Sequence, residues 1–157
     1  MVLDFDAGNT ILLFSITADA ETNQFVMRLN SEWTSKSAST VLGFIENELT
    51  SRPNDPQVLF ARAVAAAELE QWCRGATNYC ARAIDVVRHD TNYTAEDKRI
   101  LLSELSCHQE FFTVTIDTFK EPADSFPQTN ALIQAEMFQA GPDKFPYAEF
   151  LSKIRSP

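Results

Sequence analysis

The sequence predicts a mainly α-helical protein that folds as one domain across its 157 residues. From residue 38 onward, apolar residues recur every three or four positions, which is the spacing of one helix face. Within residues 1–35, two short runs instead come close to strict alternation, which favours a β-hairpin. We therefore expect a β-hairpin over 1–35, helices over 38–88 and further helices over 94–157.

The weakest helical signal lies in the first thirty residues. Two short apolar runs alternate with polar or smaller residues, and the five residues 19–23 suit a connection between two strands. The same short runs also fit a helix, so strand and helix both stay open, with the hairpin preferred. The alternating residues are Leu12, Phe14 and Ile16 in the first run, and Phe25, Met27 and Leu29 in the second.

Helix boundaries are clearest around two prolines. The apolar stripe from Val41 to Leu49 must end before Pro53, because proline disfavours the helical conformation of the residue before it. Asp55 then stands where an N-cap residue belongs, and Pro56 takes the first helical position. A new helix is thus expected to begin at Pro56 or directly after it.

The strongest local signal is a pair of helices over residues 57–70 and 72–88, separated by a very short turn. The first is rich in alanine, and side chains that small let a second helix approach closely. The second carries one continuous apolar stripe. Its members are Trp72, Ala76, Tyr79, Ala83 and Val87.

Three more helices are expected after this pair. Thr94, with Asp97 three residues later, is typical of an N-terminal cap, and the helix that follows should reach about Phe119. Its apolar face comprises Leu101, Leu105, His108, Phe112, Ile116 and Phe119. Residues 129–140 and 143–155 should form two shorter helices.

The stretch from Pro53 to Trp72, continued by Gly75, Tyr79, Ala83 and Ile84, resembles a tetratricopeptide repeat. Similar repeats place a small residue at the tight helix crossing, here Ala63, and an aromatic residue at the start of the second helix, here Trp72. The sequence departs from that pattern at Glu70, where such repeats commonly have a glycine. The small residue of the second helix falls on Gly75 or Ala76, depending on register.

This resemblance implies a non-enzymatic interaction module: an adaptor, chaperone or scaffold with a protein or peptide partner and no cofactor. Similar modules bind a partner segment in a concave groove lined by the first helix of each pair. By position, the groove face here comprises Gln57, Phe60, Val64, Ala67 and Glu68. It lacks the Lys and Asn that similar modules use to bind a carboxylate, so an apolar or aromatic-anchored segment is expected. In the competing interpretation, Phe60 and Val64 are ordinary core residues.

A second motif lies near the N-terminus. The turn from Asp6 to Thr10 resembles the phosphate-binding turn of actin-like ATPases and related kinases, in which Asp6, Gly8, Asn9 and Thr10 would contact phosphate. A complete enzyme of that kind needs two lobes and a second phosphate loop, and the chain has only four glycines. The alternative is a turn in which these residues serve backbone geometry.

Composition limits the classes of partner. The chain carries 22 acidic and 13 basic side chains, a net charge of −9, which argues against nucleic acid because phosphate binding needs clustered Lys and Arg. The longest strongly apolar run, Ile11–Ile16, is interrupted only by Ser15 and is far shorter than the roughly 20 residues of a membrane span, so no membrane partner is expected. Acidic residues near the start, where a secretion signal is basic, favour a cytoplasmic protein. The charge also permits a third function, that of an acidic inhibitor or immunity-type protein; the oligomeric state is left open.

Metal and catalytic sites find no support in the spacing of cysteine and histidine. Cys73 and Cys80 are seven residues apart, and Cys107 and His108 lie on another predicted helix, whereas zinc sites usually include a closely spaced ligand pair. Buried thiols are the expected alternative. Neither His89 nor His108 belongs to a recognisable nucleophile–base motif, so no catalytic residue is assigned.

Overall fold

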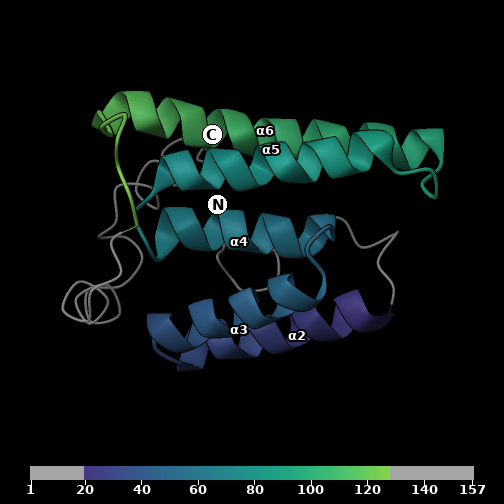
Figure 1. Ribbon diagram of the computed structural model, residues 1–157, viewed down its shortest axis with the longest axis horizontal. Helices are drawn as coiled ribbons and strands as arrows, with labels where there is room; N and C mark the ends of the chain where they lie inside the picture. Colours follow the sequence, from purple (N-terminus) through teal and green to yellow (C-terminus); the bar gives the residue numbers. More distant parts are fainter. Residues whose placement is uncertain (1–19, 128–157) are drawn as a thin grey trace, which may run out of the picture.

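The computed structural model describes residues 20–127, and this part of the chain contains five α-helices and no strand. They are α2 (Ala20–Ser35), α3 (Ala38–Ser51), α4 (Pro56–Glu68), α5 (Cys73–His89) and α6 (Ala95–Phe119). Their axes run roughly side by side in a stack, with α2 and α3 at one end, α4 in the middle and α5 and α6 at the other end (Figure 1). The mainly helical prediction is confirmed. The predicted helices over 129–140 and 143–155 lie outside the described residues.

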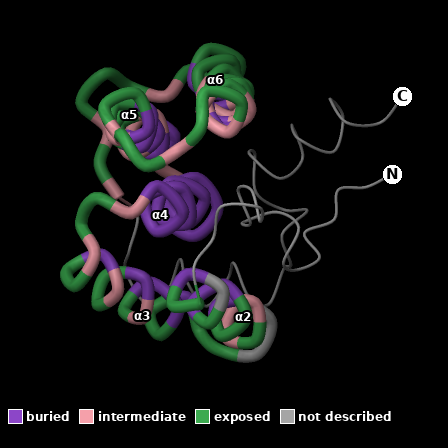
Figure 2. The backbone as a smooth tube through the Cα atoms, turned by 90° about the vertical axis from the view of Figure 1, so that its right-hand side faces the viewer, coloured by how far each residue is buried: buried purple, intermediate pink, exposed green. Residues whose placement is uncertain are grey.

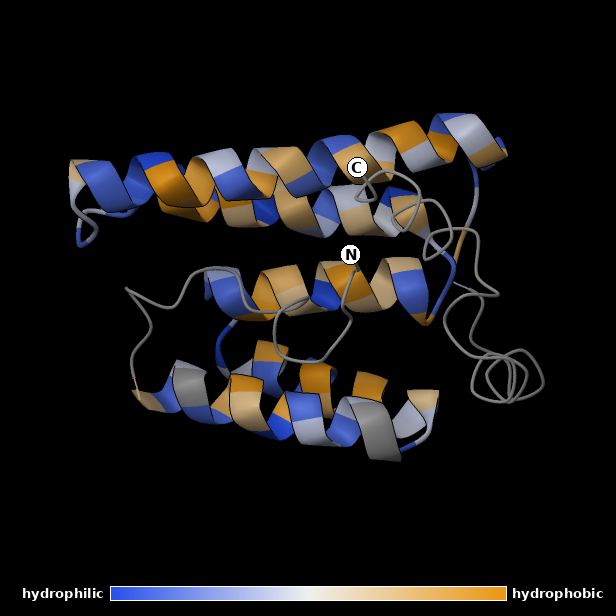
Figure 3. Cartoon of the chain, turned by 180° about the vertical axis from the view of Figure 1, so that it is seen from behind, coloured by the Kyte–Doolittle hydropathy of each residue, from blue (hydrophilic) through white to orange (hydrophobic). Residues whose placement is uncertain are grey.

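Neighbours in sequence are neighbours in space. The most extensive packing joins α4 to α5 and α5 to α6, and smaller contacts join α2 to α3 and α3 to α4. Figure 2, which looks along the helices, places α2 and α6 on one side of the stack, α3 and α5 on the other, and α4 between them. Polar and apolar stretches alternate along α5 and α6 (Figure 3), as expected for helices with one buried face.

Residues 20–35 form a helix, so the second strand and the connection of the expected hairpin are wrong. Phe25, Val26 and Leu29 are 3%, 5% and 0% exposed, a spacing of one and three that fits one helix face. Alternation would have grouped Met27 with Phe25 and Leu29, but Met27 is 71% exposed. The ring of Phe25 stacks on Phe44 of α3 at 5.4 Å, so packing between helices decided the conformation. The first predicted strand lies outside the described residues.

Two predicted helix starts are confirmed by their caps. Asp55 accepts hydrogen bonds from the backbone N–H groups of Gln57 and Val58, at 2.9 and 3.4 Å, and Pro56 opens α4. Thr94 accepts a hydrogen bond from the backbone N–H of Asp97 at 3.1 Å. Side-chain oxygens thus satisfy N–H groups that have no partner inside the helix, which fixes where α4 and α6 begin.

Helix α4 is the centre of the described fold. All 13 of its residues are buried, including the polar ones. A helix covered around its whole circumference must be enclosed by neighbours on every side. Among the helices of residues 20–127, none is long and apolar enough to span a membrane.

Gly75, in the first turn of α5, lies directly under the indole ring of Trp72, the N-cap residue of the same helix. A Cβ added at Gly75 would lie 2.2 Å from the Cε3 atom of Trp72. The ring cannot easily move away, because its Nε1–H donates to the Ser125 carbonyl at 3.1 Å. We expect Gly75→Ala to lower the free energy of unfolding by about 1–3 kcal/mol in urea denaturation, the usual cost of overpacking.

Gly43→Ala is the matched control for this prediction. Gly43 is exposed in the middle of α3, and a Cβ there would meet nothing within 4 Å. Replacing a helical glycine with alanine should then stabilise the protein by up to about 1 kcal/mol. A gain of stability in both variants would contradict the packing of Trp72 on Gly75.

Candidate functional site

The predicted groove face of α4 is closed to solvent in this chain. Its five residues share one face of the helix, and their exposed fractions lie between 0 and 6%. The Phe60 ring contacts the imidazole of His108 at 4.7 Å between centroids, so this face of α4 is directed toward α6. The members are Gln57, Phe60, Val64, Ala67 and Glu68.

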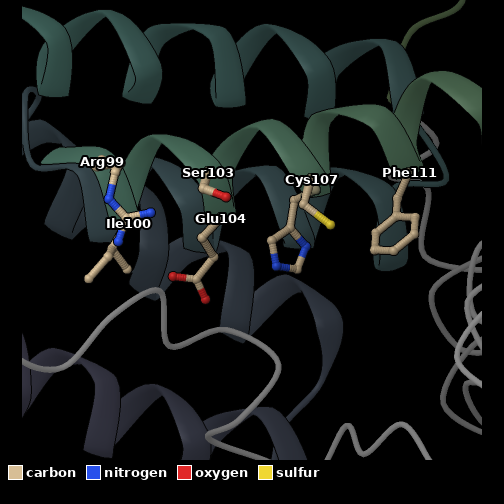
Figure 4. Close-up of a pocket in the computed structure, with 7 residues that line it drawn as sticks. Arg99, Ile100, Ser103, Glu104, Cys107 and Phe111 are labelled. Atoms are coloured by element: carbon tan, nitrogen blue, oxygen red, sulfur yellow. The ribbon is translucent and has the colours of Figure 1, made fainter. Parts of the chain in front are cut away.

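Beside this face, one side of α6 lines a cavity of about 590 Å³. Cavities of a few hundred cubic ångströms are the usual size of ligand-binding sites. The labelled side chains project from the same side of the helix (Figure 4). The described residues that line it, called the α6 wall below, are Arg99, Ile100, Ser103, Glu104, Cys107, His108 and Phe111.

Helix α6 therefore has two distinct faces: one is buried against the core, as the sequence predicted, and the other lines the cavity. Leu101, Leu105, Phe112 and Ile116 are buried as expected. His108, assigned to that same face, instead belongs to the α6 wall, and Phe119 is 42% exposed. The wall has its own spacing of three and four residues, and its apolar members Ile100, Cys107 and Phe111 are the signal that the single-stripe interpretation missed.

Charge on the α6 wall is sparse. Arg99 forms an ion pair with Glu96 at 2.5 Å, and both side chains are about two-thirds exposed. The other charged member is Glu104, whose pKa is raised to about 7 because burial disfavours its ionised form. The wall thus offers a carboxyl group that changes charge near neutral pH, in a mainly apolar setting.

Glu104 should make stability depend on pH. Because its pKa rises from 4.5 to about 7 on folding, the folded state favours the protonated form. The resulting stabilisation is complete below the unfolded pKa and is lost as the pH rises through the folded pKa. We expect Glu104→Gln to become progressively more stable than the wild type between about pH 5 and pH 8, measured by urea unfolding. Glu110→Gln, at an exposed site of α6, is the control. If the free energy of unfolding of Glu104→Gln changed with pH in parallel with that of the wild type, the raised pKa of Glu104 would be contradicted.

The three cysteines differ in exposure. Cys73 and Cys80 are buried as expected, and burial raises the pKa of both thiols to about 12. Cys107 is exposed on the α6 wall, so the expectation of three buried thiols is wrong for this residue. Within residues 20–127, no three His, Cys, Asp or Glu side chains gather closely enough to hold a metal ion.

The structure does not describe the phosphate-binding turn expected from the sequence, and His89 lies on a different helix from the α6 wall. Asp6, Gly8, Asn9 and Thr10 lie outside the described residues. His89 lies at the exposed end of α5, with Nδ1 3.4 Å from a carboxylate oxygen of Asp85 one turn earlier. Among the described residues, the α6 wall is thus the accessible candidate site, and the buried groove face of α4 lies beside it.

Comparison with known proteins adds no relative. The sequence matches no protein-family model, and neither the curated proteins nor the solved structures contain a match to it.

Proposed function

We propose that the chain is a tetratricopeptide-like, non-enzymatic interaction module that binds a segment of a partner protein on the α6 wall, beside the buried groove face of α4. The observation that carries this proposal is the cavity of about 590 Å³ along α6, next to the face that the sequence resemblance assigns to partner binding. The alternation of helices on the two sides of the stack supports it (Figure 2), because similar modules line their binding surface with every second helix.

The chemistry of the wall favours an apolar partner segment. Ile100 and Phe111 lie near its two ends, the His108 ring contacts the Phe111 ring, and the Phe60 ring contacts the His108 ring. Its only guanidinium group, that of Arg99, is already paired with Glu96. An acidic tail would find little to neutralise it, whereas aromatic or aliphatic anchors would bury apolar area.

A selection from a phage-displayed peptide library against the full chain tests this proposal. We expect peptides with aromatic or aliphatic anchors, whose dissociation constants are then measured by calorimetry. Ser103 is exposed at the centre of the wall, so Ser103→Arg should block the cavity and weaken binding at least about tenfold, or about 1.4 kcal/mol.

Ala81→Arg is the matched control, since Ala81 is exposed on α5 and an arginine there adds the same side chain away from the wall. Its affinity should stay within about twofold of the wild type. Peptides that bind both variants equally, or a selection that yields no binder, would contradict the proposed site. Unchanged circular dichroism of both variants shows that the comparison concerns binding and not folding.

A further inference from the structure

Glu104 places a carboxyl group in the middle of the α6 wall. Its side chain extends away from the helix, between Ile100 on one side and Cys107 and Phe111 on the other (Figure 4). Within residues 20–127, no hydrogen bond or ion pair engages this carboxyl group, and burial is the cause that raises its pKa to about 7. The group is therefore available to pair with a molecule that binds in the cavity.

The surroundings of Glu104 supply no counter-charge for it. Arg99, the one arginine among the described lining residues, is already paired with Glu96. Helix α5 packs against α6 but contributes no described residue to the lining of the cavity. The other titratable side chains of the α6 wall and of the groove face of α4 are Cys107, His108 and Glu68.

We propose that the partner segment bound on the α6 wall carries a lysine or arginine that pairs with Glu104, between two apolar anchors that pack on Ile100 and Phe111. The proposal rests on the proposed function and names the chemistry of its partner. A segment lying over the wall would complete the burial of Glu104, and a buried carboxylate without a counter-charge is strongly destabilising. The net charge of −9 adds a long-range attraction for a cationic segment.

Helix geometry sets the spacing of these three contacts. At a rise of about 1.5 Å per residue, Ile100 and Phe111 lie about 6 Å and about 10 Å from Glu104 along the helix axis. An extended segment advances about 3.3 Å per residue, so its cation should stand about two residues from one anchor and about three from the other. The spacing of the anchors around the cation is therefore part of the proposal.

Parallel selections from one phage-displayed peptide library test the proposal. The full chain is used at pH 8 as wild type, as Glu104→Gln and as the matched control Glu110→Gln, which is exposed on α6 outside the wall. Peptides selected on the wild type and on Glu110→Gln should carry lysine or arginine between two apolar anchors. This enrichment should disappear on Glu104→Gln.

Two failures of this experiment have different meanings. Peptides that Ser103→Arg blocks, but that show no enrichment of lysine or arginine, would overturn the cationic partner and leave the proposed function standing. If no peptide is selected, or if Ser103→Arg blocks none, the proposed function fails and the cationic partner fails with it.

Calorimetry at pH 8 measures the ion pair itself. The tightest peptide from the wild-type selection is compared with a version in which methionine replaces its lysine or arginine. The exchange should weaken binding to the wild type at least tenfold, or about 1.4 kcal/mol, and binding to Glu104→Gln less than threefold. Equal losses on both proteins would overturn the pairing. Circular dichroism of Glu104→Gln checks that the variant is folded.

The two peptides should also respond to pH in opposite directions. Because the pKa of Glu104 is about 7, its carboxyl group is mostly protonated at pH 6 and mostly ionised at pH 8. Binding of the cationic peptide favours the ionised form, so its affinity should rise several-fold between these pH values, whereas that of the methionine version should fall. Glu104→Gln keeps His108 and Cys107, so the pH dependence left in this variant is their contribution and is subtracted. The same remaining trend for both peptides would overturn the proposal.

Discussion

Arg62→Leu is expected to lower the free energy of unfolding by about 3–5 kcal/mol, the usual cost of leaving one partner of a buried ion pair alone. The Arg62 side chain is only 6% exposed, and its Nη1 lies 2.5 Å from a carboxylate oxygen of Glu70, which is 5% exposed. Without the guanidinium group, the Glu70 carboxylate would remain buried with no counter-charge. Burying a charge without a partner is among the most destabilising single changes in a protein.

The position of Arg62 between three helices explains why its loss should destabilise the fold so strongly. From α4 its Nε donates to Glu46 of α3 at 2.6 Å, and its guanidinium lies 4.8 Å from the centre of the Tyr79 ring of α5. Burial alone would lower the pKa of Arg62, but the hydrogen bond and charge of Glu70, with the hydrogen bond of Glu46, outweigh it and raise the pKa. The side chain thus stays charged and connects three helices with the turn between α4 and α5.

A double-mutant cycle measures this pair. Arg62→Leu, Glu70→Leu and the double variant are compared by urea denaturation at neutral pH. Two leucines fill the site without buried charge, so the double variant should be within about 1 kcal/mol of the wild type or more stable than it. A loss below about 1 kcal/mol for Arg62→Leu would mean that water reaches Glu70, and would contradict the burial of the pair.

Glu70 also shows what the repeat resemblance could and could not predict. The two helices and the short turn between them were predictable from the apolar spacing. The absence of glycine at Glu70 was a departure from the pattern without an explanation in the sequence. In the turn between α4 and α5, the residue with positive φ is Gln71, at 50°, so Glu70 needs no glycine-like backbone and its side chain can pair with Arg62.

Most helix boundaries could be predicted because they depend on residues close in the sequence. The elements predicted wrongly depend on contacts between residues far apart in the sequence. Asp55 and Thr94 cap their helices through residues two or three positions away, which a sequence displays directly. Residues 20–35 fit two periodicities, and the stacking of Phe25 on Phe44 selects one of them. The α6 wall was missed because a strong apolar stripe on one face of α6 concealed a weaker stripe on another.

The cap of α5 is a second case in which the deciding residue is far away in the sequence. Trp72, at the N-cap position, provides no side-chain hydrogen bond to the helix. Glu121, from the segment after α6, accepts instead from the backbone N–H groups of Cys73 and Arg74, each at 2.7 Å. No spacing rule predicts a cap 47 residues from the helix that it closes.

Glu121→Ala should therefore lower the free energy of unfolding by about 2–3 kcal/mol, because two N–H groups lose a charged acceptor at a helix N-terminus. Glu121→Gln retains one acceptor oxygen and should lose about half as much. Asp117→Ala removes an exposed carboxylate one turn earlier and should change stability by less than about 0.5 kcal/mol. Urea denaturation gives the free energies, and the amide resonances of Cys73 and Arg74 report whether the cap is lost.

A second set of hydrogen bonds, from the Arg74 side chain, joins the same segment to the start of α5. The Arg74 side chain donates to the carbonyls of Pro122 and Glu121 at 2.7 and 2.9 Å, so the segment after α6 is held against the start of α5 on both sides of the cap. This contact fixes the C-terminal end of α6 against the start of α5. A loss of stability in Glu121→Ala no larger than that of Asp117→Ala would mean that the end of α6 is held by its apolar face alone.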